Sequence, residues 1–252
     1  MSSFYRLEAL GIVLDLGQYE QLFVAGQVLS GAWGLWRLGR AGVPAWRCLL
    51  LPWFAVPSII YGSHLFAWVT FGRPLGYVLY GGLFAALASG ALAWRVFYRP
   101  WLSGQQWFDE GMVALLLGFI PCRVGCHISG CCYGTPVPGG WPSVTYPGNQ
   151  MAGPPFSYAR DIPLHPAAAY EALGMVLLLL SAAGLRKRLR PGMQGWLLLG
   201  GYAVLRLLLE FIRWDPRGGA LLGLYPSQLM SLGVLAVMAL ALWTDRRPEP
   251  QD

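Results

Sequence analysis

Charged residues are scarce in this chain of 252 residues, since Asp, Glu, Lys and Arg together make up only 12% of it. Apolar residues contribute 56%, and the mean hydropathy is positive at +0.47. An ordinary soluble domain carries about 25% charged residues, because its surface must remain in water. The composition therefore excludes a soluble globular domain and indicates an integral membrane protein.

The chain also has little that would mark a leader, a repeat array or a linker. The stretch before Tyr19 lacks a basic start and a small-residue cleavage site, so we do not expect a removable signal peptide there. Its mixture of Leu, Ile and Val with Glu8 and Asp15 suits a short segment at the membrane surface. Without repeats or low-complexity linkers, residues 1–252 are expected to form a single transmembrane domain.

Long apolar runs are what the sequence does contain. A helix needs about 20 mostly apolar residues to cross the hydrocarbon core of a bilayer. Such runs are expected to be helical, because backbone polar groups find no water there. The predicted fold is therefore all-α, a polytopic bundle of about seven transmembrane helices. The predicted spans are residues 19–38, 48–69, 76–96, 110–126, 168–185, 194–213 and 220–243.

The net charge of +6 follows the pattern of a membrane topology, so no nucleic-acid partner is expected. Most basic residues lie in alternate connections, after the first, third, fifth and last spans. These residues are Arg37, Arg40, Arg47, Arg95, Arg99, Arg186, Lys187, Arg188, Arg190, Arg246 and Arg247. The positive-inside rule then predicts a cytoplasmic C-terminus and an N-terminus outside. It also predicts an outer-face loop at about residues 131–167.

Charged side chains inside the predicted spans are candidates for function. Each costs about 3 kcal/mol unless it is paired or faces a polar cavity. Arg123 lies in the otherwise apolar "MVALLLGFIPCRVG", with no acid one helical turn away. Arg206 and Glu210 are four residues apart, so they can form an ion pair on one helix face. His165 begins the polar sequence "HPAAAYE" at the outer end of the fifth span.

Arg123 and Arg206 both fall toward the outer leaflet in this topology. A guanidinium group presents a fork of N–H donors that matches the oxygens of a phosphate. At that depth in a membrane, the available phosphate belongs to a phospholipid headgroup. We therefore predict that the two arginines bind the phosphate of a membrane lipid.

The segment "CRVGCHISGCCYG", residues 122–134, contains four of the five cysteines, and three interpretations of it remain open. In the first, small cysteines fill space, with a disulfide at an oxidising outer face. In the second, Cys126 or Cys131 is a nucleophilic thiolate favoured by Arg123 and helped by His127. The third is a zinc site formed from Cys122, Cys126, His127, Cys131 and Cys132. Its spacing is not a repeated C-x2-C, and adjacent cysteines rarely reach one ion, so no metal or cofactor is predicted.

These motifs, in this order, resemble the prolipoprotein diacylglyceryl transferase family. The sequence "RVGCHISGCCYG" is similar to the family signature through Arg123, Gly125 and Gly134. "HPAAAYE" resembles the family's His-Pro-x-x-x-Tyr-Glu, and "GYAVLRLLLEFIR" resembles its Gly-Tyr-x-x-x-Arg-x-x-x-Glu-Phe-x-Arg. "YGGL", residues 80–83, takes the place of its His-Gly-Gly. The resemblance runs from about Tyr19 to the basic C-terminus.

The resemblance implies a multi-pass transferase of the bacterial inner membrane. Its substrates would be phosphatidylglycerol and the lipobox cysteine of a preprolipoprotein, with transfer of the sn-1,2-diacylglyceryl group to the thiol and release of glycerol phosphate. The catalytic residues predicted on this basis are Arg123, Arg206, Cys126, Cys131 and Tyr80. The predicted substrate-binding residues are Tyr19, Gly81, Gly82, Gly125, Ser129, Gly134, Tyr202, Glu210 and His165.

Several reactive positions of the family hold other residues in this chain. Tyr80 stands where the family has histidine, Cys126 and Ser129 stand where it has asparagine, and Cys131 stands where it has glutamate. Two alternatives therefore remain open. One is a diverged paralogue that uses a cysteine nucleophile and a different acceptor. The other is a membrane protein that binds phospholipid or responds to redox state without catalysis.

Three further residues have two interpretations each. His64, inside the second span, is expected to be a hydrogen-bonded buried histidine, and the alternative is a general base that replaces the family's histidine. Gly81 and Gly82 either admit a lipid headgroup or allow two helices to pack closely.

Overall fold

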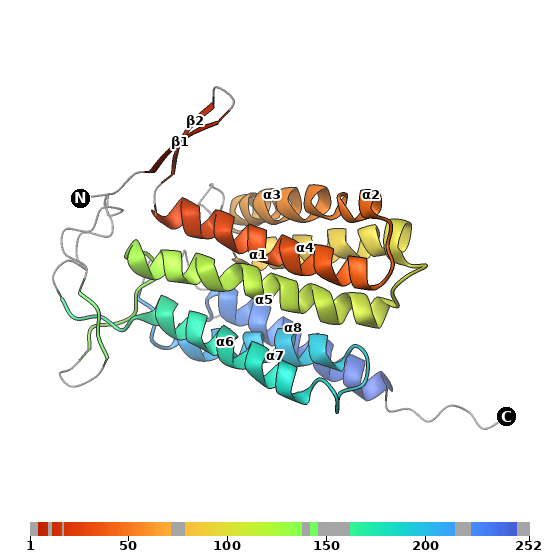
Figure 1. Cartoon of the computed structure of the whole chain (residues 1–252). Coiled ribbons are helices and arrows are strands. Elements are labelled where there is room, and N and C mark those ends of the chain that lie inside the picture. Colours follow the sequence, from red (N-terminus) through yellow and green to blue (C-terminus); the bar gives the residue numbers. More distant parts are fainter. Residues whose placement is uncertain are drawn as a thin grey trace.

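The computed structural model describes residues 5–9, 12–16, 18–71, 79–137, 142–145, 162–214 and 223–245. Long helices lie side by side in a bundle, and a short hairpin projects from the bundle beside the start of the first helix (Figure 1). In chain order the elements are β1 (Tyr5–Ala9), β2 (Ile12–Leu16), α1 (Gln18–Arg40), α2 (Ala45–Cys48), α3 (Leu51–Phe71), α4 (Leu79–Ala93), the π-helical turn η1 (Trp94–Tyr98), α5 (Gly104–Ile128), α6 (Ala167–Leu185), α7 (Met193–Glu210) and α8 (Pro226–Asp245).

Each of the seven predicted spans overlaps one long helix of the bundle, so the prediction of helices is confirmed. Among the described residues, four helical segments are long and apolar enough to cross a membrane: Ala45–Val69, Gly104–Ile128, Ala167–Leu185 and Pro226–Thr244. The chain is therefore a helical membrane protein.

The stretch before Tyr19 differs from the prediction, because it forms the antiparallel hairpin β1–β2. Arg6 pairs with Asp15 and Leu7 pairs with Leu14 in its register. Polar and apolar residues alternate along Tyr5–Ala9, a period of two that is typical of strands, and Ile12–Leu16 begins with two β-branched residues, which favour strands. The all-α prediction therefore holds for the bundle and is wrong for this hairpin.

Helix α5 lies at the centre of the bundle and packs against α1, α6 and α7, while α3 packs against α4 and α8 packs against α7. The core around α5 contains fully buried Met112, Leu116, Met175 and Leu198. Large apolar side chains are also exposed on the outer faces of the helices, including Trp53, Leu65, Val69, Leu180, Leu208 and Leu240. In a membrane protein these outer faces contact lipid, so their exposure carries no cost.

Side chains at the start of α5 cap two helices, α5 itself and α7. Ser103 and Gln106 form a capping box, in which each side chain bonds the other's backbone N–H. One turn later, the Asp109 carboxylate accepts hydrogen bonds from the backbone N–H groups of Gly192 and Gly195, at 2.7 and 2.6 Å. Asp109 thereby caps α7 and ties its first turn to that of α5.

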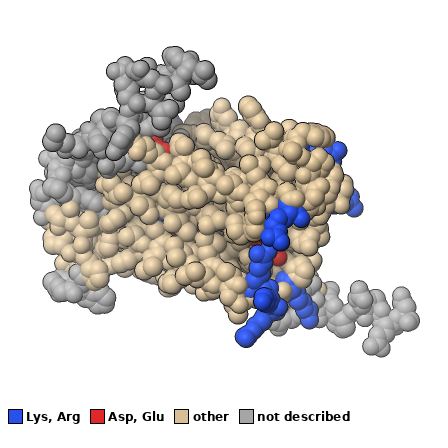
Figure 2. Space-filling view, in the orientation of Figure 1, with Lys and Arg blue, Asp and Glu red and all other residues tan. Residues whose placement is uncertain are grey.

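The same end of the bundle carries most of the positive charge of the described residues. Figure 2 shows Lys and Arg gathered there, around an acidic group. Glu110 forms ion pairs with Arg37 and with Arg186, the latter at 2.7 Å, and accepts a hydrogen bond from Trp33 Nε1 at 3.1 Å. We refer to this end, where α1 stops and α5 and α7 begin, as the basic end.

Helices α1 and α5 approach closely at Gly26, and this contact gives a stability prediction. A Cβ atom at Gly26 would overlap the carbonyl oxygen of Gly118, which belongs to the backbone and cannot move aside alone. We expect Gly26→Ala to destabilise the protein by about 1–3 kcal/mol through overpacking. Thermal unfolding of the detergent-solubilised protein measures this as a lower Tm.

Gly31 on the same helix is the matched control, because a Cβ atom there meets nothing within 4 Å. Gly31→Ala is expected to leave the Tm unchanged or slightly higher, since alanine favours helix more than glycine does. Equal Tm values for the two variants would contradict the close α1–α5 contact.

Candidate active site

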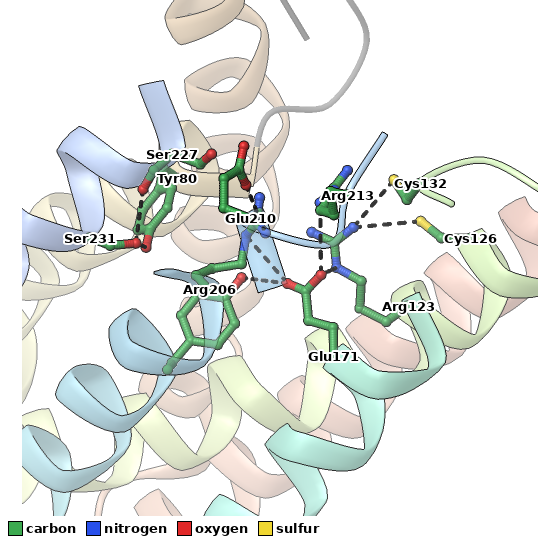
Figure 3. A network of polar contacts seen from close by, with 11 residues as sticks. Tyr80, Arg123, Cys126, Cys132, Glu171, Arg206, Glu210, Arg213, Ser227 and Ser231 are labelled. Carbon is green, nitrogen blue, oxygen red and sulfur yellow. Dashed lines mark hydrogen bonds and ion pairs between the residues drawn. The ribbon is translucent and has the colours of Figure 1, made fainter. Parts of the chain in front are cut away.

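Three arginines converge on one buried glutamate at the end of the bundle away from the basic end (Figure 3). Arg123 Nε lies 3.2 Å from Glu171 Oε2, and Arg206 Nε lies 3.7 Å from Glu171 Oε1. Arg213 Nη1 lies 4.0 Å from Glu171 Oε2. Arg206 Nη1 also lies 3.4 Å from Glu210 Oε2, which confirms the ion pair expected from their spacing. We call these five residues the ionic cluster.

The ionic cluster is assembled from three helix ends. Arg123 lies in the last turns of α5, Glu171 in the first turn and a half of α6, and Arg206 and Glu210 in the last turns of α7. All are buried: the exposed fractions are 7% for Arg123, 1% for Glu171 and 5% for Arg206. Charges so deeply buried are stable only when each has partners of opposite sign. Three guanidinium groups face two carboxylates here, so the cluster has one net positive charge.

A small backbone junction positions Arg213 after the end of α7. Thr135 N donates a hydrogen bond to Ile212 O at 2.7 Å, and Gly134 forms an isolated bridge with Arg213. Gly134 N also donates to His165 O at 2.9 Å. A Cβ atom at Gly134 would lie 2.6 Å from His165 Cβ and 2.8 Å from Ile212 O, so this position requires glycine. The predicted site residues Gly134 and His165 therefore lie together beside the cluster.

Two tyrosines extend the ionic cluster toward α4 and α8. Tyr202 donates its hydroxyl proton to Glu171 Oε1 at 2.8 Å, and its ring lies 6.3 Å from the ring of Tyr80. Ser231 donates its single proton to Ser227 O at 2.8 Å, so it accepts a hydrogen bond from the Tyr80 hydroxyl. Tyr80 is thus a neutral donor already engaged with Ser231, at the position where the family has histidine.

Three thiols lie together on the other side of Arg123. The sulfur atoms of Cys126, Cys131 and Cys132 all lie within 4.8 Å of one another, and we call them the thiol cluster. Cys131 N bonds Cys126 O at 3.1 Å in the tight turn after α5. Cys132 has φ of 57°, an uncommon value for a residue other than glycine. All five cysteines of the chain lie in the described part and are free thiols.

The left-handed backbone at Cys132 explains how two consecutive cysteines reach one point. In extended chain, successive side chains point in opposite directions. The turn at Cys132 places its sulfur on the same side as that of Cys131. The sequence-based expectation that adjacent cysteines do not converge is therefore wrong for this loop.

Arg123 connects the thiol cluster to the ionic cluster. Its Nη1 donates hydrogen bonds to Cys132 Sγ at 3.6 Å and to Cys126 Sγ at 3.8 Å, while its Nε faces Glu171 (Figure 3). The pKa of the Cys132 thiol is lowered well below its ordinary value, because the thiols of Cys126 and Cys131 hydrogen-bond to it and the guanidinium groups of Arg213 and Arg123 lie close. Cys132 is therefore the thiol that most readily carries negative charge.

Three predicted residues lie near the end of α5, where the first turn of α1 packs against it. A Cβ atom at Gly125 would lie 3.2 Å from Cδ2 of Tyr19, so the Tyr19 ring packs against this glycine. Ser129 is the C-cap residue of α5, and its backbone N–H bonds Gly125 O at 2.9 Å. The first turn of α1 thus packs against α5 at the residue that precedes Cys126.

Some predicted residues lie away from both clusters. A Cβ atom at Gly81 would lie 2.6 Å from Gly62 O, and one at Gly82 would lie 2.8 Å from Ser63 Oγ, so both glycines serve close packing of α4 on α3. Cys48 belongs to a separate core cluster near the basic end, where its thiol hydrogen-bonds Val43 O at 3.6 Å. His64 is half-buried on α3.

Three residues of these clusters were not among the predicted site residues: Glu171, Arg213 and Cys132. Glu171 has the strongest signal in the sequence, since it closes the motif "HPAAAYE" at the start of a helix. Arg213 closes the motif "GYAVLRLLLEFIR" in the same way. Nothing in the sequence distinguishes Cys132 from Cys131, because its place depends on the backbone turn.

The bundle and its buried ionic cluster define a polytopic membrane protein with a charged centre enclosed by helix ends. A family model described as prolipoprotein diacylglyceryl transferase matches residues 17–244. The chain belongs to the prolipoprotein diacylglyceryl transferase family and is an enzyme of the transferase class.

Individual relatives carry the corresponding name. The phosphatidylglycerol–prolipoprotein diacylglyceryl transferase of Dehalococcoides mccartyi is 28% identical over 229 residues, which cover 87% of this chain and 85% of that protein. The protein of the same name from Clostridium tetani is 31% identical over 180 residues, covering 68% of this chain and 65% of its own length. The resemblance seen in the sequence motifs is confirmed.

Proposed function

We propose that the chain transfers the sn-1,2-diacylglyceryl group of phosphatidylglycerol to a cysteine thiol, that of a lipobox in a preprolipoprotein. The observation that carries the proposal is the convergence of Arg123, Arg206 and Arg213 on the single carboxylate of Glu171. A net positive cluster buried in a membrane protein suits an anionic phosphodiester. Relatives named for this reaction support the same substrates.

The proposed topology follows from the two ends of the bundle. Lys and Arg gather at the basic end, where α5 and α7 begin (Figure 2), and the ionic and thiol clusters lie where α5 and α7 end. By the positive-inside rule, the basic end faces the cytoplasm and the clusters lie toward the outer leaflet. We propose seven spans in a bacterial inner membrane, with the N-terminus outside and the loop at about residues 131–167 on the outer face.

In the proposed reaction, the arginines bind the phosphate and the neighbouring cysteine segment receives the acceptor thiol. The acceptor sulfur attacks the glycerol carbon that carries the phosphate, a C–S bond forms and the C–O bond breaks. The electron pair of that bond leaves with glycerol phosphate, and the thiol proton is released. Arg123 and Arg206 stabilise the charge that grows on the leaving phosphate. The segment from Cys126 to Tyr133 adjoins Arg123, so the acceptor thiol is proposed to approach from this side.

Other predicted residues lie around the ionic cluster and the thiol cluster. Tyr202 and Glu210 hold the ionic cluster, while Tyr19, Gly125 and Ser129 border the thiol cluster. Gly134 and His165 form the junction that carries Arg213. These residues position the arginines and the thiols, and the arginines contact the substrate.

The experiment that tests the function is a reconstituted transfer reaction. The purified full-length chain is mixed in detergent with phosphatidylglycerol and a lipobox peptide that contains one cysteine, and the peptide mass is recorded. The expected result is a mass increment of one diacylglyceryl group, absent when serine replaces the peptide cysteine. Lipid binding without any modified peptide, beside an active relative as a control, would overturn the proposal in favour of a non-catalytic phospholipid-binding protein.

Tyr80→Phe is expected to have a small effect on this reaction. The substitution removes one neutral hydrogen bond, to Ser231, and leaves the ring against Tyr202. A hydrogen bond of this kind contributes about 1 kcal/mol, so the transfer rate should fall less than about tenfold. A much larger fall in rate, with an unchanged Tm, would mean that the Tyr80 hydroxyl takes part in proton transfer.

A further inference from the structure

We propose that Cys126, Cys131 and Cys132 bind one thiophilic divalent metal ion of the zinc class, whose fourth coordination position receives the acceptor thiol. The proposal concerns the thiol half of the site, and its role in catalysis rests on the proposed transferase function. Three observations carry it: the convergence of the sulfurs, the backbone that produces it, and the guanidinium that contacts it.

The spacing of the sulfurs fits a tetrahedral ion. Zinc–sulfur bonds of about 2.3 Å in tetrahedral geometry separate the sulfur atoms by about 3.8 Å. The three sulfurs already lie within 4.8 Å of one another, so modest side-chain rotations suffice. Within the described part of the chain, these cysteines are the one group of three or more Cys, His, Asp or Glu residues with such spacing.

The backbone that produces this spacing is unusual. In the described ranges, Cys132 is the one residue other than glycine with a positive φ, and Gly130, two residues earlier, also has a positive φ. Backbone held in a sparsely populated region costs about 1–3 kcal/mol and tends to occur at functional sites. A loop that merely filled space with cysteines would have no need to turn two consecutive sulfurs toward a third.

Arg123 provides the electrostatic environment that a thiolate site requires. Three thiolates around a divalent ion carry one net negative charge. Arg123 Nη1 donates hydrogen bonds to the sulfurs of Cys132 and Cys126, and these bonds stabilise negative charge on both sulfurs. Hydrogen bonds of this type orient metal ligands and tune the ion. The remainder of the same guanidinium faces Glu171, so the metal would adjoin the proposed phosphate site.

Such an ion would supply a means of deprotonating the acceptor thiol in the proposed reaction. A zinc ion with three protein ligands keeps one position open, and a thiol bound there is deprotonated. Tyr80, at the place of the family's histidine, is a neutral donor engaged with Ser231 and does not act as a base. The acceptor thiol would bind as a thiolate, release its proton to water, and then form the C–S bond as glycerol phosphate leaves.

Chemistry also favours a metal-binding role for these cysteines over the alternative, in which one of them is the nucleophile. If Cys126 or Cys131 took the diacylglyceryl group itself, the product would be a thioether. Breaking that C–S bond in a second transfer requires a neutral, unactivated thioether to expel a thiolate, which is a poor leaving group. Direct attack by a metal-bound acceptor needs only one C–S bond to form.

Metal binding is measured independently of activity with Co²⁺ as the probe. The full-length protein is reduced, stripped with a chelator, and titrated with Co²⁺ in detergent. We expect about one equivalent to bind, with sulfur-to-cobalt charge-transfer bands and the visible spectrum of a tetrahedral ion. Cys131→Ser should weaken binding at least about 100-fold, and Cys48→Ser, whose thiol lies near the basic end, should not change it. The ligand variant Cys126→Ser guards against a folding defect particular to Cys131→Ser.

A second titration tests the open position. A lipobox peptide with cysteine is expected to shift the visible spectrum of the Co²⁺-loaded protein, and the serine peptide is expected to leave it unchanged. Absence of charge-transfer bands in the reduced protein, or disulfide-linked cysteines that cannot be metal-loaded, would overturn the site. Binding of Co²⁺ without a peptide-dependent shift would overturn the role of the fourth position. If the metal properties hold and no transfer product forms under any condition, the proposed function fails while the metal site stands.

Discussion

Glu171→Gln is expected to abolish measurable diacylglyceryl transfer and to destabilise the protein by about 3–5 kcal/mol, because it removes the carboxylate shared by three buried guanidinium groups. Without that carboxylate, Arg123 and Arg213 lose the ion pairs that Glu171 gives them, and Arg206 retains only its pair with Glu210. The amide also accepts more weakly from the Tyr202 hydroxyl. Transfer assays with the lipobox peptide and thermal unfolding in detergent measure the two effects.

Glu110→Gln is the matched control for this prediction. Glu110 also pairs with two arginines, Arg37 and Arg186, but these lie at the basic end and are more exposed than the ionic cluster. Pairs near the surface contribute about 0–1 kcal/mol, so the Tm should change little and transfer should continue. Equal losses in the two variants would show that Glu171 has no special role in the site.

Arg206→Lys should lower the rate of transfer by about 100- to 1,000-fold while the protein stays folded. The lysine keeps the charge, but its single ammonium group cannot reach Glu171, Glu210 and a phosphate together, as the planar guanidinium can. If Arg206 stabilises the departing phosphate, kcat falls more than the affinity for phosphatidylglycerol. Steady-state assays over a range of lipid concentrations separate the two quantities.

Arg186→Lys serves as the control for this substitution, since Arg186 lies at the basic end and is partly exposed. Its transfer rate is expected to remain within about twofold of the unmodified protein, as for most surface substitutions. A threefold or smaller loss for Arg206→Lys, with Tm unchanged, would contradict the assignment of Arg206 to the phosphate.

Much of the bundle was predictable because membrane helices obey strong constraints. Runs such as 168–185 must be helical to bond their own backbone in lipid, so their limits follow from hydropathy. The hairpin before Tyr19 escaped prediction, because only its first strand alternates with a period of two and the second, Ile12–Leu16, is a short, mostly apolar run that does not distinguish a strand from another apolar segment. The sequence also indicated three charged positions inside the spans, Arg123, Arg206 and Glu210. A charged side chain in an apolar span costs free energy, so it is a candidate for function.

The parts of the site that escaped prediction depend on three-dimensional convergence. Glu171 was visible as a residue at a helix start, but its role depends on three arginines that belong to other helix ends. The thiol cluster depends on the left-handed turn at Cys132, which the sequence "GCCYG" does not specify. Local pattern therefore singled out Arg123 and Cys126 as candidates, and only the fold showed which residues contact them.

The most direct measurement follows both products of the proposed reaction at once, with phosphatidylglycerol labelled in its terminal glycerol. The purified chain is incubated with this lipid and the lipobox peptide, and lipidated peptide and labelled glycerol phosphate are quantified together. The account predicts equal amounts of the two products, neither of which forms when serine replaces the peptide cysteine. Labelled glycerol phosphate that forms without lipidated peptide, or no product under conditions in which a relative is active, would contradict it.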